Sequence, residues 1–590
     1  MKNIKKLLGI LFAVLAILFN FYSINLHLTV DFLQPTTEAL TATVFWFLSI
    51  VLFGISVFIF FPCSKRKIKP KESLFLVEKV IFGVILILGL ALRIHKIDHS
   101  GIYLDEKYWL YEAKNILKGT IRSPFGPLAD YPTNMPAYFI TPFLSLLKNP
   151  YYAVRLPGVI FSMFNIIFVF SFLKEAFNKK VALVSALLLS TSIWDIHNSR
   201  LGFQNVNLNP FLISGAMFFL YRGIKYFSKR DIFICGVFLG LCINMLYVAS
   251  LCVITTCFYC LYHFLFKKHK QKKQLLVIGI LLLISTFITS SPTFIKIKKR
   301  PQFYLGRHQG FLRENVERSQ KDQRPLFYYF KQLKSAVEDF NYQPEKFIKI
   351  GLWGASLNLI ALIALVLGLI FSLKNIFLPQ YLLILLNFFI MFVPIVIVYR
   401  SASLWREYAF LPTLFMLSTI GIDLVSSLLS KIINLFTRHA LKINFQKVVL
   451  LLIFLVYFFF WGKLYSQYYH FHLKKHPDIY ESHCQQTAHY IKDFIPSQTT
   501  LLLPDEVCQA LILVVLEDQY LYQVYKTPSD LNNLKNGNKY ALVYINNLSP
   551  NKIKKKSFKQ YLEQAGFSYE EKRIGVENEK IYSYIYLFSK

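Results

Sequence analysis

Two adjacent carboxylates, Asp105 and Glu106, stand among the aromatic residues Tyr103, Tyr108 and Trp109. An acidic side chain near a membrane surface could act as a general base that accepts the proton of an attacking hydroxyl group. Acidic residues also favour the first turn of a helix, where the helix dipole stabilises negative charge, so a capping pair is the alternative interpretation. Catalysis would require a helix that begins at this pair and lies at the membrane surface.

Positive charge gathers in several places where an anionic ligand would need it. The segment 296–349 contains thirteen lysines and arginines against six acidic residues, and its run Lys296–Arg300 directly follows an apolar stretch, where a lipid headgroup would lie. Arginine suits phosphate because its planar fork can bind two oxygens at once. We expect an anion site for a phosphate-bearing lipid, although long loops also tolerate positive charge and cations extend to headgroups without a specific role. The candidate ligands, in order of preference, are Arg200, Arg406, Lys299 and Arg300.

The last part of the chain contains side chains that bind metal in other proteins. The histidine spacing matches no defined metal site, so we interpret these residues as amphipathic and interfacial, and the need for a divalent metal stays open. Two cysteines, Cys484 and Cys508, could form one disulfide, whereas the cysteines in or beside apolar runs are expected to act as small buried apolar residues. The latter are Cys235, Cys242, Cys252, Cys257 and Cys260. The histidines are His470, His472, His476, His483 and His489.

The chain around these residues has the composition of a membrane protein. Of its 590 residues 55% are hydrophobic and 17% are charged, and the mean hydropathy is +0.42. The net charge of +33 would suit nucleic acid, but the lysines and arginines fall in short clusters between apolar runs, as in the cytoplasmic loops of membrane proteins. The composition therefore predicts an α-helical polytopic membrane protein that binds no nucleic acid. Runs that reach or approach the ~20 residues of a membrane span are Leu7–Tyr22, Val80–Leu92, Leu275–Ile288, Leu357–Phe371 and Val448–Trp461.

Basic clusters alternate with less basic turns if the chain crosses the membrane about thirteen times with its N-terminus inside. The first apolar run follows a basic N-terminus and has no small-residue cleavage site, so we expect a retained signal anchor. The stretch Ile232–Phe266 could be one bent helix or a hairpin. On this threading the segments 93–150 and 296–349, and everything after about residue 471, lie outside.

We expect three regions: two extra N-terminal transmembrane helices in 1–73, a main transmembrane module in 74–470, and an extracytoplasmic α/β domain in 471–590. In the first outside loop, the apolar positions of Lys107–Lys118 repeat at helical spacing and predict a helix on the membrane surface. The last region combines a helical stretch at Thr487–Phe494 with strand-like runs at Thr500–Leu503, Tyr540–Ile545 and Ile581–Leu587.

Five short motifs occur in the order found in one known protein class. They are DEKYWLYEAKNILKG at 105–119, PAYF at 136–139, RLP at 155–157, SIWDIHNSRLGF at 192–203, and REY at 406–408 ahead of Pro412. Each motif is weak alone, but five in order are a strong signal. The chain thereby resembles the GT-C class of membrane glycosyltransferases, and most closely its protein O-mannosyltransferase and aminoarabinose-transferase-like branch (glycosyltransferase families 39 and 83).

This resemblance implies a donor sugar linked to polyprenyl phosphate, a reaction on the non-cytoplasmic face, and Asp105 as the acidic residue at the reacting centre. One departure lies at 134–136 (Asn-Met-Pro), where relatives in the aminoarabinose branch often carry a lysine that reaches the donor phosphate. Polyprenyl phosphate leaves as a stable anion, so one general base suffices, and direct displacement predicts inversion. Glu106 could orient the acceptor, share a metal or cap the helix, while the four candidate cations would stabilise the departing phosphate. A bacterial plasma membrane is the expected location, and the acceptor could be a protein, a glycolipid or a growing polysaccharide.

Three alternatives stay open at the level of sequence. A lipid or solute transporter would place ionisable groups within the bilayer, whereas here the charged residues lie at the ends of the apolar runs. An enzyme that transfers a whole lipid-linked glycan would be a second possibility, although the chain has no Trp-Trp-Asp motif of the oligosaccharyltransferase kind. An inactive relative that serves as a scaffold is the third.

Overall fold

The computed structural model describes most of the chain. The described residues are 2–30, 36–61, 75–98, 104–120, 122–126, 133–147, 149–202, 205–245, 247–302, 357–397, 406–436, 445–470, 482–504, 522–525, 539–545, 568–577 and 580–589, with short pieces between 310 and 334 and between 560 and 564.

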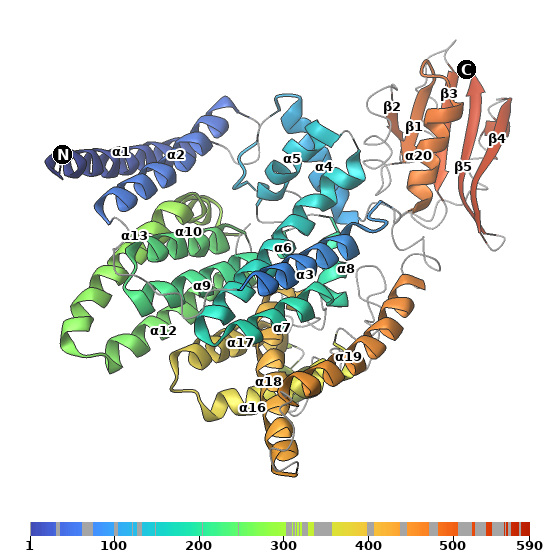
Figure 1. The fold of residues 1–590 in the computed structure, drawn as a ribbon. Coiled ribbons are helices and arrows are strands. Elements are labelled where there is room, and N and C mark those ends of the chain that lie inside the picture. Colours follow the sequence, from blue (N-terminus) through green and yellow to red (C-terminus); the bar gives the residue numbers. More distant parts are fainter. Residues whose placement is uncertain are drawn as a thin grey trace.

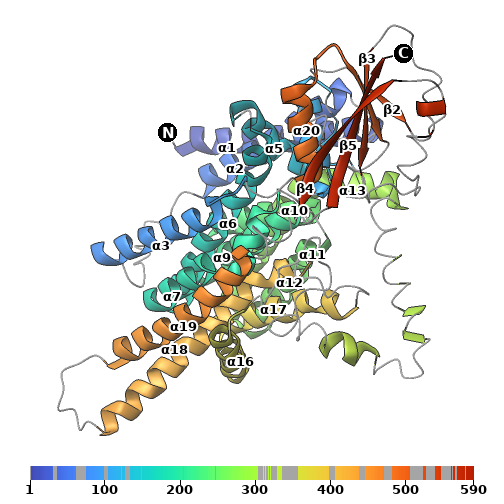
Figure 2. The same ribbon diagram turned by 90° about the vertical axis from the view of Figure 1, so that its right-hand side faces the viewer.

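Helices account for nearly all of the described residues up to 470 (Figures 1 and 2). In chain order they are α1 (Lys2–Thr29), α2 (Thr37–Phe60), α3 (Leu76–Ile94), α4 (Leu104–Leu117), α5 (Met135–Leu147), α6 (Pro150–Ala176), α7 (Lys179–Ser190), α8 (Ile193–Arg200), the 3-10 helix η1 (Asn205–Leu208), α9 (Asn209–Tyr226), α10 (Lys229–Met245), α11 (Tyr247–Ser250), α12 (Cys252–Phe266), α13 (His269–Lys299), α16 (Leu359–Lys374), α17 (Pro379–Ile397), the 3-10 helix η2 (Arg406–Phe410), α18 (Leu411–Phe436) and α19 (Phe445–His470).

Among the described residues, seven helical segments are long and apolar enough to cross a membrane; they correspond to α1, α2, α6, α12, α13, α18 and α19. Helices α7 and α8 would make an eighth span as a bent pair, with an angle of 54° between them. Five further helices of the bundle, α3, α9, α10, α16 and α17, are shorter or carry more charge. The structure confirms an α-helical polytopic membrane protein, and these helices of the described residues support the expected count of about thirteen spans in part.

The two N-terminal helices form a hairpin that packs on α13 and α10. The side-chain amide of Asn20 donates hydrogen bonds to Ile288 O and Ser291 Oγ, both at 3.1 Å. The indole of Trp46 donates to Thr289 O at 2.9 Å. Because lipid offers no hydrogen-bond partner, such bonds between helices hold membrane bundles together. Polar contacts therefore fasten the hairpin to the main module.

Helices α16 and α18 approach each other through glycines. A Cβ atom at Gly368 would lie 1.9 Å from Leu417 O, and one at Gly421 would lie 1.9 Å from Ala364 O. Only a residue without a side chain permits this distance, as in other closely packed membrane helices. The contact fixes α18, whose N-terminal end carries η2.

A five-stranded sheet with the order β2-β1-β3-β5-β4 follows the bundle. Strand β1 is parallel to β2 and β3, while β5 is antiparallel to β3 and β4. Helix α20 (Ser482–Phe494) packs against β4 and β5. Both views place this α/β domain at the end of the bundle that carries α4 and α5 (Figures 1 and 2). The strands are β1 (Thr500–Pro504), β2 (Tyr522–Tyr525), β3 (Lys539–Ile545), β4 (Tyr569–Glu577) and β5 (Lys580–Ser589).

These elements test several expectations from the sequence. The predicted C-terminal helix and the three predicted strands are confirmed as α20, β1, β3 and β5, whereas β2 and β4 were not predicted. The helix expected over Lys107–Lys118 is α4, which begins at Leu104. The stretch Ile232–Phe266 contains two helices, α10 and α12, joined through the short α11, and is not one bent helix.

Candidate active site

The start of α4 is held by a buried ion pair. Arg155 of α6 donates from Nε to Glu106 Oε1 and from Nη2 to Glu106 Oε2, both at 3.0 Å. The backbone N–H of Gly202, just after α8, also donates to Glu106 Oε1. A Cβ atom at Gly202 would lie 2.2 Å from Glu106 Cγ, so the carboxylate fits only against a glycine. Both carboxylate oxygens of Glu106 are therefore engaged, and the ion pair ties the first turn of α4 to α6.

The backbone that leads from α3 toward α4 is held by two arginines. Arg155 Nη1 donates to Ile97 O at 2.5 Å, and Arg200 Nη2 donates to Lys96 O at 2.8 Å. Lys96 adopts the left-handed conformation, with φ of 53°, which a non-glycine residue rarely does without support from its surroundings. Asp105 is the second residue of α4, and its side chain lies outside the described part of the structure.

A second buried acid, Asp195 in α8, connects four elements. It pairs with Arg93 of α3 at 2.6 Å, accepts a hydrogen bond from Ser162 Oγ of α6 at 2.9 Å, and accepts another from the Tyr408 hydroxyl of η2. Arg93 and Asp195 are both fully buried, so each charge depends on the other for compensation. Ser192 caps α8 by accepting a hydrogen bond from Asp195 N at 3.2 Å. Through Asp195, the motif at 192–203 therefore connects α8 with α3, α6 and η2 at this end of the bundle.

Sequence reasoning did not select Arg93, Arg155 or Asp195 as members of a site. Two of them were visible as parts of the motifs at 155–157 and 192–203, and Arg93 stands at the end of an apolar run. An arginine or aspartate within a membrane helix is rare without a partner. From this rule, the sequence alone could have predicted that the arginines and the aspartate pair with opposite charges.

A cationic and aromatic corner lies where α3, α8 and α19 meet. Lys96 Nζ bonds to the hydroxyl of Tyr469, and His197 Nδ1 lies 3.3 Å from the hydroxyl of Tyr468. Arg200 is only 7% exposed, and its Nη1 has no hydrogen-bond partner. A buried guanidinium nitrogen without an acceptor is costly, so it marks a position where an anionic oxygen would be stabilised.

The other predicted phosphate ligands occupy different places. Arg406 begins η2, two residues before Tyr408, and its side chain lies outside the described part. Lys299 Nζ donates to Val30 O at 3.1 Å, at the end of α13 that packs on α1, and Arg300 follows directly. Because α8 packs instead on α3, α6 and α19, the structure does not bring Lys299 and Arg300 to Arg200.

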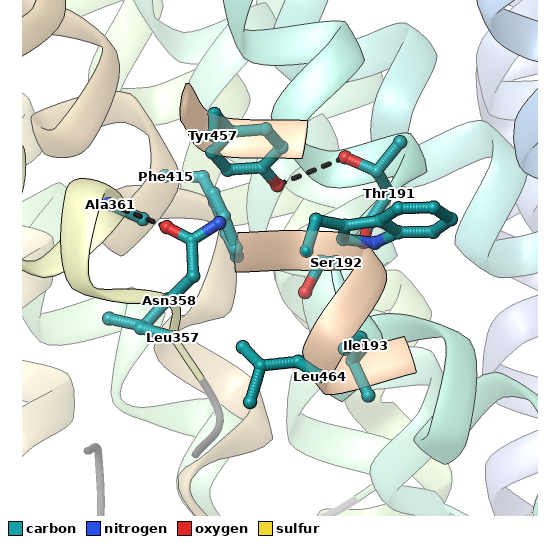
Figure 3. A pocket seen from close by; sticks show the side chains of 10 residues that line it. Thr191, Ser192, Ile193, Leu357, Asn358, Ala361, Phe415, Tyr457 and Leu464 are labelled. Carbon is teal, nitrogen blue, oxygen red and sulfur yellow. Dashed lines mark hydrogen bonds between the residues drawn. The ribbon is translucent and has the colours of Figure 1, made fainter. Parts of the chain in front are cut away.

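A small pocket opens between α7, α16, α18 and α19 (Figure 3). Tyr457 and Thr191 share a hydrogen bond of 3.0 Å at its wall, and Trp461 Nε1 donates to Thr191 O at 2.6 Å. Asn358 caps α16 through Ala361 N at 2.8 Å. The pocket volume is about 10 Å³, close to the space that one water molecule needs, so this pocket is too small for a sugar ring.

The described residues contain no group of three or more His, Cys, Asp or Glu side chains placed to hold a metal ion. The tail histidines from His472 onward, and the predicted pair Cys484 and Cys508, lie outside the side chains that the structure describes. Cys235, Cys242 and Cys252 are free and buried, as expected for small apolar residues in a helix bundle.

Comparison with known proteins identifies relatives of this arrangement. A family model described as dolichyl-phosphate-mannose-protein mannosyltransferase matches residues 131–290. No functionally curated protein sequence matches the chain significantly. The archaeal oligosaccharyltransferase AglB from Archaeoglobus fulgidus, in complex with an inhibitory peptide and a dolichol-phosphate, is similar over 79% of this chain and 69% of its own, with 12% identity and a TM-score of 0.50. ArnT from Cupriavidus metallidurans, bound to undecaprenyl phosphate, is similar over 86% of this chain and 97% of its own, with 11% identity and a TM-score of 0.50.

At such low identity the two structures establish the shared fold alone. The family model contributes the sequence signal, which begins after Asp105 and includes the motifs at 136–139, 155–157 and 192–203. Fold and family model agree with the class that the sequence motifs predict. The chain is therefore a multi-pass membrane protein that shares the fold of the glycosyltransferases AglB and ArnT, and its residues 131–290 match the mannosyltransferase family model.

Proposed function

We propose that this protein transfers one sugar from a polyprenyl-phosphate carrier to an acceptor hydroxyl group on the extracytoplasmic face of the plasma membrane. The donor class is supported by the two similar structures, one of which holds a dolichol-phosphate and the other undecaprenyl phosphate. The side of the membrane is supported by the basic clusters, which put the ends of α3, α8 and α19 that meet near Arg200 on the outer face.

The observation that carries the proposal is the support given to the first turn of α4. Arg155 anchors Glu106, and together with Arg200 it also holds the backbone at 96–97. A general base must be held within a fraction of an ångström of its productive position, and a helix end fixed on buried ion pairs provides such rigidity. Asp105 occupies this supported turn.

In the proposed mechanism Asp105 accepts the proton of the acceptor hydroxyl as its oxygen attacks the anomeric carbon. The bond from that carbon to the phosphate oxygen breaks, and polyprenyl phosphate leaves as an anion that needs no proton. Direct displacement inverts the configuration at the anomeric carbon. Arg200, with a free Nη1, is positioned to stabilise the leaving phosphate, and Lys96 adds positive charge beside it. Arg406 remains a candidate for the same role, whereas Lys299 and Arg300 are better suited to bind lipid headgroups near α1.

The test uses full-length protein in lipid nanodiscs with undecaprenyl phosphates that carry a hexose, a pentose or an amino sugar. Release of free undecaprenyl phosphate is measured for the wild type, for Asp105→Asn, and for Asp98→Asn as a control. Asp98 is an exposed carboxylate seven residues before Asp105, so its replacement removes the same charge near the same helix. We expect Asp105→Asn to lower the release rate by about a hundredfold or more, in the range of general-base catalysis, and Asp98→Asn to leave it within about twofold.

Equal rates for the wild type and Asp105→Asn would exclude Asp105 as the base. Transfer of a whole lipid-linked glycan is the second candidate, because the fold is also that of the oligosaccharyltransferase AglB. Release from a polyprenyl-linked oligosaccharide but from none of the monosaccharide donors would favour it. The stereochemistry is read by nuclear magnetic resonance of the product, and retention of the anomeric configuration would exclude direct displacement.

A further inference from the structure

A buried polar cluster lies in the first outer loop, away from the anchored start of α4. Glu112 of α4 is 1% exposed, and Asn134, just before α5, is also 1% exposed. The side-chain amide of Asn134 donates to Glu112 Oε1 at 2.9 Å. Arg122, whose side chain is 35% exposed, places Nη1 3.8 Å from Glu112 Oε2. These three residues belong to segments that backbone bonds hold together, such as Asn134 N to Pro124 O at 3.0 Å.

Each member of this cluster has a buried polar atom without a hydrogen-bond partner. The atoms are Glu112 Oε2, Asn134 Oδ1 and Arg122 Nε. The amide orientation of Asn134 follows from its neighbour, because the reverse orientation would point Oδ1 at the Glu112 carboxylate and repel it. Two acceptors and one donor are therefore left without a hydrogen bond, and buried groups of this kind call for a partner such as a ligand, an ion or a water molecule.

The chemistry of the cluster excludes an anionic ligand as its occupant. Glu112 is a buried carboxylate whose partner Arg122 is partly solvated, so the inner part of the cluster repels phosphate and attracts donors. The Tyr138 hydroxyl donates to Arg122 O, and burial, together with the Glu112 carboxylate, raises its pKa above the ordinary value. That hydroxyl therefore stays protonated at neutral pH. A hydroxyl group of a ligand can both donate and accept a hydrogen bond. It therefore fits the unsatisfied acceptors Glu112 Oε2 and Asn134 Oδ1 beside the unsatisfied donor Arg122 Nε.

We propose that Glu112, Asn134 and Arg122 form the subsite that recognises the hydroxyl groups of the donor sugar. This inference rests on the proposed function and assigns a determinant of sugar specificity to it. Glu112 lies seven residues after Asp105 on α4, which is two helical turns, or ~10 Å of rise. A donor whose anomeric carbon lies near the start of α4 would place its sugar ring along the helix toward Glu112.

If the subsite binds the sugar and other residues bind the phosphate, the two contributions to affinity can be measured separately. Equilibrium binding to full-length protein in nanodiscs is compared for undecaprenyl phosphate and for the same lipid carrying a hexose, a pentose or an amino sugar. The quantity of interest is the ratio between the dissociation constants of the sugar-free and the sugar-bearing lipid. In the wild type we expect this ratio to exceed ten for at least one sugar.

Glu112→Gln is expected to reduce that ratio by about tenfold, the effect of one hydrogen bond to a charged group, with unchanged affinity for the sugar-free lipid. Glu175→Gln is the matched control, since Glu175 pairs with Lys225 at 2.6 Å at the far end of α6. Arg122→Gln is the second variant, at a side chain that is 35% exposed, whereas Glu112 is 1% exposed. It should lower the same ratio and also spare the sugar-free lipid.

An unchanged ratio in both variants, or equal weakening of the sugar-free and sugar-bearing lipids, would overturn the subsite. A wild type that binds no sugar-bearing lipid better than the sugar-free one would overturn it too. The proposed function fails separately: if no donor in the panel is turned over but Glu112→Gln still abolishes the sugar-dependent ratio, the subsite stands and the reaction is wrong.

Discussion

Replacement of Arg155 by methionine should loosen the start of α4 and reduce turnover. Methionine has a similar length and fills the space between the helices, so the main change is the loss of the guanidinium. Arg155 is 1% exposed and Glu106 is fully buried, and three hydrogen bonds from Arg155 are lost, two to Glu106 and one to Ile97 O. The buried Glu106 carboxylate would then lose the positive charge of its ion pair with Arg155.

Breaking a buried ion pair by removing one partner typically costs about 3–5 kcal/mol, because an uncompensated charge remains. The double variant Arg155→Met with Glu106→Gln removes both charges, and it should recover roughly half or more of this loss. Misplacement of a catalytic group by about 1 Å can lower the rate about a hundredfold. We therefore expect Arg155→Met to lower turnover by roughly that factor, and the double variant to be less impaired.

Thermal unfolding in nanodiscs measures stability, and hydrogen exchange measures the opening of α4. Release of undecaprenyl phosphate measures activity. Arg313→Met is the control, because Arg313 is 83% exposed and pairs at 2.9 Å with Glu317, which is 53% exposed, so the pair is worth about 0–1 kcal/mol. If Arg155→Met were no less stable than Arg313→Met, or if hydrogen exchange in α4 were unchanged, the ion pair would not be what holds the helix.

Two further predictions concern the packing of the bundle. Gly421→Ala should destabilise the protein by about 1–3 kcal/mol in thermal unfolding, because the new methyl group would overlap Ala364 O and separate α16 from α18. The control is Gly279→Ala, which should leave stability unchanged because its new methyl group meets nothing within 4 Å. Equal effects of the two substitutions would refute the close contact between α16 and α18. Asn20→Leu should lower stability by about 1–2 kcal/mol through the loss of hydrogen bonds to α13. Proteolysis between the N-terminal hairpin and α3 would then release the hairpin more readily, and an unchanged thermal midpoint would show that these bonds do not fasten it.

The membrane character and the order of helices could be predicted because they depend on short-range patterns. Apolar runs of sufficient length and basic clusters between them are visible one segment at a time. The same holds for α4, whose apolar positions repeat at helical spacing, and for β3, whose run Tyr540–Ile545 is continuous and apolar. Strand β4 was missed because Glu570, Glu571 and Lys572 give it a charged sequence, and its pairing with β5 is a tertiary contact.

The candidate site could be predicted only in part, since its geometry joins residues that are distant in sequence. Glu106 and Arg155 are 49 positions apart, and Arg93 and Asp195 are 102 apart. The sequence shows that charged residues stand at the ends of apolar runs, but it does not show which acid meets which base. Arg200 ranked above Lys299 among the candidate phosphate ligands, but only the packing of α8 and α13 shows that the two lie apart.

The pairing of acids with arginines supports Asp105 as the base by elimination. A general base must remain ionised and be able to reach a proton on the acceptor. Glu106 is enclosed by Arg155 and Gly202, and Asp195 is enclosed by Arg93, Ser162 and Tyr408, so neither can leave its partners without stranding a buried charge. In α8 and the first turn of α4, these two acids therefore hold the helices, which supports the proposal that Asp105 carries out proton transfer. An Asp195→Asn variant that lost stability and activity together, beside an Asp105→Asn variant that lost activity alone, would establish that division of roles; the reverse pattern would exclude it.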